Sequence, residues 1–137
     1  MIRKMQKILW SVAGLAICGT VGYGHHSIAG AYDSNQPRTI EGTVTQFQFI
    51  NPHPFLLIDV MQAGGIAQSW KLEMDNRSEL AQIGVTRETF KAGDRVIING
   101  SLSRSQPLSL YIWKLDRPAD GLQYEQVGGT PRIRPRR

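Results

Sequence analysis

The sequence predicts a mainly β domain, a five-stranded OB-like Greek-key barrel with one short helix between strands 3 and 4. Three observations predict it. Five short segments rich in β-branched and aromatic residues follow one another along the chain. A helix-forming segment separates the third of them from the fourth. The 137 residues leave room for a single core of modest size. A small β-sandwich is the alternative, and the position of the helix favours the barrel.

The first two strands are expected on either side of a proline-rich turn. Residues 39–50 are rich in Thr, Val, Ile and Phe and predict a long first strand, in which Gly42 marks a bulge or tight bend. Residues 51–54 (NPHP) form a turn, because two prolines remove two ladder donors and fix two φ angles. The second strand is expected over residues 55–61, and the glycines within residues 63–65 close a hairpin.

The third strand and the helix follow the hairpin. Residues 68–74 alternate between apolar and polar side chains, with Trp70 on the apolar face, which is typical of a half-buried strand. Asn76 then fits a helix cap, so the helix is expected over residues 77–83 and ends at Gly84. This is the helix on which the OB-like topology depends.

The last two strands complete the expected domain. They are predicted over residues 95–102 and 108–115, because both segments are apolar and bounded by turn residues. Residues 25–36 are polar, and residues 128–137 are rich in Gly, Pro and Arg. The chain is therefore divided into a signal peptide (1–24), an N-terminal arm (25–38), the OB-like domain (39–127) and a disordered arginine-rich tail (128–137).

The first residues have the three parts of a secretory signal peptide. Three cations within residues 1–7 precede an apolar, uncharged stretch over residues 8–19, and small residues lead to a cleavage site between Gly24 and His25. The stretch is short for a membrane span, so the mature chain is expected to have none. A retained anchor or a lipoprotein cut before Cys18 are the alternatives. The sequence thus predicts a periplasmic or secreted protein.

The basic charge belongs to the ends of the chain. The formal net charge is +5, but three of the sixteen Lys and Arg residues lie in the leader and four in the last six residues. The rest of the chain holds nine basic against eleven acidic residues. Secretion and this distribution argue against a nucleic-acid partner. The composition also excludes collagen-like, coiled-coil and wholly disordered proteins.

Several short motifs resemble those of a known family. The segments HHS (25–27), NPH (51–53) and GDRV (93–96) are similar to those of a family of small secreted bacterial proteins of unknown function. In that family an extended strand of the type seen at residues 42–44 (GTV) lies between HHS and NPH. The match covers most of residues 25–116. The resemblance implies a secreted β domain and supplies no activity.

All three histidines of the chain lie in these motifs: His25, His26 and His53. In an OB-like barrel the loop between strands 1 and 2 lies on the ligand-binding side. If the leader is cut before His25, its α-amino group and imidazole form a chelate, and His53 adds a further nitrogen. Such nitrogen-rich sites suit Cu(II) or Ni(II). The alternative is a solvated arm and a histidine that only shapes its turn.

A second set of residues is a candidate surface for an organic ligand. Barrels of this type often present aromatic side chains on which bases or sugars stack. Because the alternation of the strands places several aromatic residues on core faces, packing in the core is the alternative. The candidate ligand-binding residues are Asn51, Trp70, Tyr111 and Trp113.

These observations favour a binding module rather than an enzyme. The sequence has no phosphate-binding loop or dinucleotide fingerprint, and Ser27 beside His26 is not a catalytic triad. Charges such as Glu73 are interpreted as surface charges on a polar strand face. We therefore expect a small secreted module that binds a divalent metal, with copper favoured. The alternative is a metal-free module that binds an envelope protein or a glycan.

Overall fold

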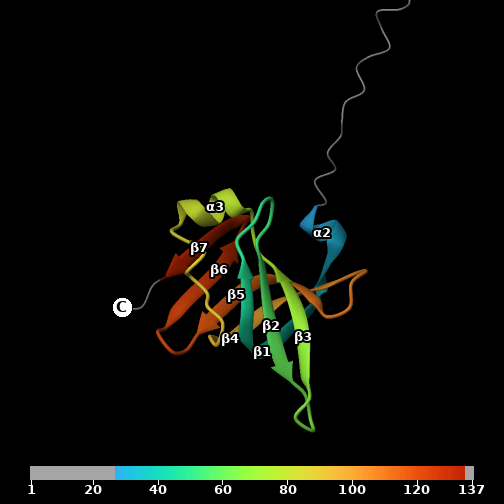
Figure 1. The fold of residues 1–137 in the computed structure, drawn as a ribbon. Coiled ribbons are helices and arrows are strands. Elements are labelled where there is room, and N and C mark those ends of the chain that lie inside the picture. Colours follow the sequence, from blue (N-terminus) through green and yellow to red (C-terminus); the bar gives the residue numbers. More distant parts are fainter. Residues whose placement is uncertain (1–26, 135–137) are drawn as a thin grey trace, which may run out of the picture.

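The computed structural model describes residues 27–134, which are mainly β (Figure 1). The predicted signal peptide, Cys18, His25 and His26 lie outside the described residues. The elements follow in the order α2 (Ile28–Ala31), β1 (Tyr32–Gln48), β2 (Phe55–Met61), β3 (Ala67–Glu73), α3 (Arg77–Gln82), β4 (Arg95–Ser103), β5 (Ser109–Arg117), β6 (Leu122–Val127) and β7 (Thr130–Arg134).

Five of the strands close into a ring. The strand order is β3-β2-β1-β4-β5-β6-β7, and β3 also pairs with β5. This last pairing is parallel and short, because it joins only Lys71, Leu72 and Glu73 to their partners in β5. All the other strand pairs are antiparallel. The mainly β prediction is therefore confirmed, as are the five strands and the helix between strands 3 and 4.

The first strand differs from the prediction in where it begins and in where its bulge lies. The expected strand over residues 39–50 begins earlier, at Tyr32, so half of the expected arm, residues 32–38, belongs to the sheet. Its first residues pair with β4, where Tyr32 lies opposite Ser103. The bulge expected at Gly42 falls instead between Val44 and Gln46.

The expected disordered tail is wrong for Thr130–Arg134, which forms β7 and pairs with β6. The reason lies in the turn. Gly128 and Gly129 have φ values of 57° and 83°, which a two-residue hairpin turn requires and side chains other than glycine rarely adopt. On the new strand, Pro131 is buried and Ile133 packs against the core. Residues 135–137 lie outside the described part of the chain.

The core fills the ring and is built from alternating residues of its strands. In β2 and β4 the buried side chains largely alternate along the strand, whereas β5 buries Leu110, Tyr111 and Ile112 in succession. The helix α3 contributes Leu80, which is fully buried. The largest fully buried aliphatic side chains are Leu56, Ile58, Leu72, Met74, Leu80, Ile98, Leu110, Ile112 and Leu115.

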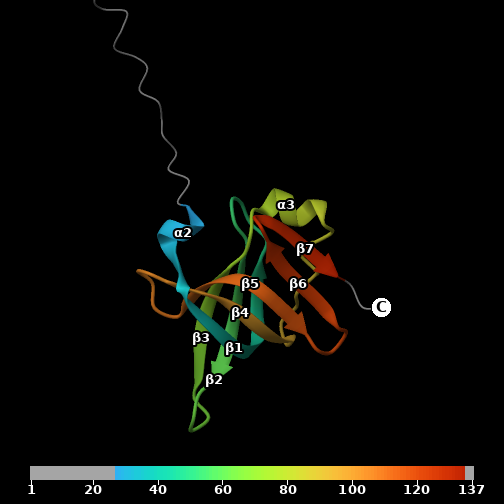
Figure 2. The ribbon, with the colours of Figure 1, turned by 180° about the vertical axis from the view of Figure 1, so that it is seen from behind.

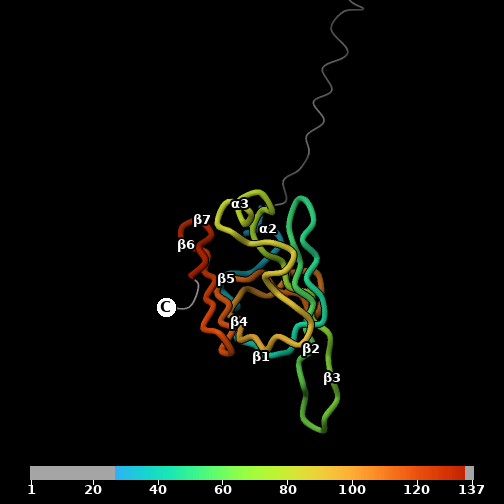
Figure 3. Tube along the Cα trace, turned by 60° about the vertical axis from the view of Figure 1, so that its left-hand side comes forward, coloured from blue at the N-terminus to red at the C-terminus, as the bar shows by residue number. Residues whose placement is uncertain are grey.

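The two ends of the molecule differ in shape. At one end, which we call the histidine end, α2 and α3 lie near the β1–β2 loop that carries His53 (Figures 1 and 2). At the other, the hairpin end, residues 61–67 form the tip of the β2–β3 hairpin, which projects beyond the body (Figure 3). Within residues 27–134, no helix has the length and apolar character needed to cross a membrane.

Candidate functional site

The NPHP turn is fixed by hydrogen bonds to the segment that follows β3. The carbonyl of Pro52 accepts a hydrogen bond from the backbone N–H of Arg77 at 2.9 Å, and that of Pro54 accepts one from Met74 at 3.0 Å. Proline has no N–H to donate, so its carbonyl is the group that ties it to its neighbours. These two bonds flank His53 on both sides and hold its backbone in place.

The ring of His53 is oriented by its Nδ1 atom. Nδ1 lies 3.0 Å from the carbonyl oxygen of Met74 and 3.5 Å from Oε1 of Glu73. Because a carbonyl only accepts hydrogen bonds, Nδ1 carries the proton in this contact. The lone pair of a neutral His53 then lies on Nε2, which makes no hydrogen bond to any residue between 27 and 134. The side chain is 25% exposed, so a ligand has access to this end of the molecule.

The other oxygen of the Glu73 carboxylate binds a residue from the start of the chain. The hydroxyl of Tyr32 donates a hydrogen bond to Oε2 of Glu73 at 2.5 Å. Burial raises the pKa of the Tyr32 hydroxyl, and the bond to Glu73 raises it further. Tyr32 directly follows α2, whose N-cap is Ser27. The first described residues are therefore connected, through two side-chain contacts, to His53.

A second contact fixes the same segment. The backbone N–H of Arg104 donates to the carbonyl of Ala31 at 2.9 Å, and its guanidinium lies 3.3 Å from Asp33. The loop between β4 and β5 thus lies beside α2. Together with the bond from Tyr32, this contact places the β1–β2 loop, α2 and the β4–β5 loop at the same end of the ring.

The predicted metal ligands are only partly described. His53 lies at the histidine end, while His25 and His26 precede the first described residue. Within residues 27–134, no three His, Cys, Asp or Glu side chains form a group that could hold a metal ion. The described part of the chain therefore offers one oriented imidazole nitrogen.

Two of the predicted ligand-binding aromatics pack against each other. Tyr111 is fully buried, and its ring centre lies 5.6 Å from that of Tyr32 and 5.2 Å from that of Trp113. The indole N–H of Trp113 donates to Oγ of the buried Ser101 at 2.6 Å. Burial, followed by the charge of Asp75, raises the pKa of the Tyr111 hydroxyl. These contacts give both side chains a role in packing beside the candidate site.

The other two predicted ligand-binding residues lie apart from this pair. Trp70 is half-buried on β3, opposite Ile58 of β2 and packed against the core. Its indole N–H is buried and has no hydrogen-bond partner within residues 27–134. Asn51 is exposed in the NPHP turn. Ligand binding by Asn51, Trp70, Tyr111 and Trp113 stays a prediction.

Sequence reasoning missed Tyr32 and misjudged Glu73. Tyr32 belongs to the predicted N-terminal arm, and an aromatic residue in that polar segment is the one signal of a docked position. Glu73 was interpreted as a surface charge, but its side chain is only 19% exposed and contacts two distant segments. The contact with His53 follows from the pairing of β2 with β3, whereas the contact with Tyr32 depends on the closure of the ring.

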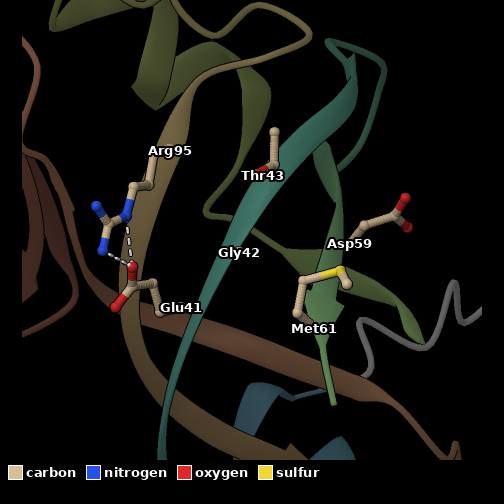
Figure 4. A pocket seen from close by; sticks show the side chains of 6 residues that line it. All are labelled: Glu41, Gly42, Thr43, Asp59, Met61 and Arg95. Carbon is tan, nitrogen blue, oxygen red and sulfur yellow. Dashed lines mark hydrogen bonds and ion pairs between the residues drawn. The ribbon is translucent and has the colours of Figure 1, made fainter. Parts of the chain in front are cut away.

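A groove of about 400 Å³ lies on the outer surface near the hairpin end (Figure 4). It contains the ion pair between Glu41 and Arg95, and its Asp59 accepts a hydrogen bond from Ser69 at 2.7 Å. Because these charged groups have partners, the groove offers no obvious group for chemistry. Its lining residues are Glu41, Gly42, Thr43, Asp59, Met61 and Arg95.

Comparison with known proteins places the chain in a family. The model of a family of unknown function, DUF6152, matches residues 13–108. The chain belongs to this family. No curated protein and no solved structure matches it.

Proposed function

We propose that this member of a family of unknown function is a small secreted or periplasmic binding module, without enzymatic activity, that binds a divalent metal ion. Copper is the favoured metal, and the proposed ligands are His53, His25 and His26. The observation that carries the proposal is the orientation of His53. Its Nδ1–H is bound to the carbonyl of Met74, which leaves Nε2 as the donor atom. Histidines that bind metals are commonly oriented by such a bond to the second nitrogen.

The covalent chain supports a contribution from the N-terminal histidines. The Cα atoms of His26 and His25 lie at most about 4 Å and about 8 Å from that of Ser27. Ser27 caps α2, and Tyr32 at the end of α2 is bound to Glu73 beside His53. This short connection favours a site shared by the HHS and NPH motifs.

The leader supports both the location and the chemistry. Its three cations, apolar stretch and small residues are typical of a signal peptide cut before His25. Cleavage there gives His25 a free α-amino group. One amine and three imidazoles provide a nitrogen-rich ligand set, which suits Cu(II) better than a hard cation such as Mg²⁺.

Calorimetric titration with Cu(II) tests the proposal. The protein used begins at His25, as the processed chain would. We expect one Cu(II) bound with micromolar affinity or tighter, and a loss of roughly tenfold or more in His53→Ala. Gln62→Ala, a substitution at the hairpin end, serves as the control and should bind like the wild type. Equal binding by His53→Ala would remove His53 from the site, and no binding by the wild type would reject the metal function.

The processing step needs its own measurement. Mass spectrometry of the exported protein should give a chain that starts at His25. A chain that starts at Cys18 would indicate a lipoprotein, and a chain that keeps residue 1 would indicate a retained leader. Either result would remove the chelating amine from the proposed ligand set.

The second candidate is a metal-free module that binds an envelope protein or a glycan. The hairpin end favours it, because Met61 and Ile66 are 63% and 71% exposed there. No charged residue lies between Asp59 and Lys71, so the projecting tip is uncharged. If Cu(II) does not bind, cross-linking in an envelope extract should capture a partner that the double variant Met61→Ser, Ile66→Ser fails to capture.

A further inference from the structure

We infer that Glu73 is the positioning residue of the proposed metal site, and that it acts through His53 and Tyr32 at the same time. This inference rests on the proposed function and goes beyond it, because it assigns a role to a residue that is not a ligand. No local pattern in the sequence connects Glu73 with either histidine motif. The connection appears only when the ring of strands is closed.

The geometry around Glu73 is that of a bridge. Its two carboxylate oxygens contact two different segments. Oε2 accepts a hydrogen bond from the hydroxyl of Tyr32, and Oε1 lies 3.5 Å from Nδ1 of His53. Glu73 itself is the last residue of β3, where it pairs with Tyr111 of β5. The bridge is therefore anchored in the ring, while its partners belong to the start of β1 and to the β1–β2 loop.

On the side of His53, the carboxylate supports the donor nitrogen. A negative charge near Nδ1–H stabilises the positive charge that the imidazole acquires when Nε2 binds a metal ion. The carbonyl of Met74 fixes the plane of the ring, and Glu73 adds the charge that a carbonyl lacks. Glu73 is thus expected to strengthen Nε2 as a ligand without touching the metal.

On the side of Tyr32, the carboxylate holds the start of β1 beside the end of β3. The bond to Tyr32 holds the end of α2 beside β3, and Ser27 lies at the other end of this one-turn helix. A tethered ligand binds at a high effective concentration only while its tether stays near the site. Release of Tyr32 should therefore weaken the contribution of His25 and His26.

Titration of Glu73→Gln with Cu(II) tests the inference. This substitution keeps the size of the side chain and removes its charge, and we expect Cu(II) to bind about 10- to 100-fold more weakly. Glu41→Gln is the matched control, because it removes a carboxylate from an ion pair near the hairpin end. It should change the affinity by less than about twofold. Thermal unfolding of the metal-free variants shows whether each one folds.

A double-mutant cycle separates positioning from general damage. If Glu73 acts through His53, Glu73→Gln should cost much less affinity in the His53→Ala background than in the wild type. An equal loss in both backgrounds would mean a merely structural effect and would overturn the inference. If Glu73→Gln does not fold, Tyr32→Phe replaces it, since it removes only the hydroxyl and keeps the ring against Tyr111.

The results also distinguish this inference from the proposed function. Loss of binding in His53→Ala together with wild-type affinity in Glu73→Gln and Tyr32→Phe would overturn the role of Glu73 and leave the metal site intact. Absence of Cu(II) binding by the wild type, or equal binding by His53→Ala, would overturn the proposed function and this inference with it.

Discussion

The two ends of the β2–β3 hairpin differ in how their residues are held. At the histidine end, Glu73 binds Tyr32 at the start of β1, and the carbonyl of Pro52 binds the N–H of Arg77 at the start of α3. The carbonyl of Pro54 and the ring of His53 contact Met74, the residue that follows β3. At the hairpin end, the contacts are local: the N–H of Gln62 donates to the carbonyl of Ile66 at 2.9 Å, within the same turn.

This difference indicates which residues the stability of the fold depends on. Contacts between distant segments depend on the whole ring, so a change near the histidine end should affect both stability and the proposed site. Local contacts in a projecting tip depend only on a few neighbours, so a change there should have little effect on the free energy of unfolding. Three predictions test this contrast by its effect on the free energy of unfolding.

The largest effect is expected at Gly100, in β4. A Cβ atom at this position would lie 2.1 Å from the carbonyl oxygen of Tyr111, which is backbone and cannot swing away. We expect Gly100→Ala to lower the free energy of unfolding by roughly 4 kcal/mol or more, or to prevent folding. Urea unfolding followed by fluorescence measures it.

Gly64, at the hairpin end, provides the comparison for Gly100. A Cβ atom there meets no atom within 4 Å, but the φ angle is 91°, so Gly64→Ala should cost about 1 kcal/mol through backbone strain alone. Similar losses for the two variants would contradict the contrast between a position packed within the ring and one in the projecting tip.

The second effect is an alkaline loss of stability caused by buried tyrosines. Burial raises the pKa values of Tyr32, Tyr111 and Tyr124 above their ordinary value of 10. Above pH 10 the unfolded chain releases these protons while the folded chain keeps them, so the stabilisation present at lower pH is lost as the pH rises. At pH 10.5 the loss should be roughly 0.8 kcal/mol for each tyrosine, or about 2.5 kcal/mol together.

Urea unfolding at pH 9 and pH 10.5 measures this loss, and Tyr124→Phe identifies its source. The variant should lose only about two thirds as much stability over this interval, because one titrating group is gone. Stability that stays constant up to pH 11 would show that these hydroxyls do not remain protonated in the folded protein.

The smallest effect is expected at the hairpin tip. Met61 and Ile66 are largely exposed, so the double variant Met61→Ser, Ile66→Ser should change the free energy of unfolding by less than about 0.5 kcal/mol. The same variant should bind Cu(II) like the wild type, if the proposed site is correct. A loss of more than about 2 kcal/mol would mean that the tip packs against the body and would remove the distinction between the ends.

Local patterns in the sequence were sufficient to predict most of the fold. The second strand was predicted over residues 55–61 and is observed as Phe55–Met61, because its composition and the turns on both sides mark it clearly. The helix was expected from its cap, and the Oδ1 atom of Asn76 does accept a hydrogen bond from the N–H of Ser78. Alternation and capping depend on residues that are neighbours in the chain, so both can be recognised in a single sequence.

Most of the missed features depend on contacts between distant segments, and one is a local hairpin at the end of the described residues. Polar residues 32–38 show no alternation, yet they form a strand because β4 offers them an edge to pair with. Residues 130–134 read as a tail, yet the turn at Gly128 and Gly129 directs them back along β6. The roles of Tyr32 and Glu73 likewise follow from ring closure, which no local pattern encodes.

The position of Tyr32 also has a consequence for the order of folding. Its hydrogen-bond partner Glu73 comes 41 residues later in the chain, and Tyr111, on which its ring packs, comes later still. When the chain is synthesised from its N-terminus, Tyr32 therefore cannot reach its final contacts until β5 has also been synthesised. Partly folded chains therefore lack this link between the start of β1 and the end of β3.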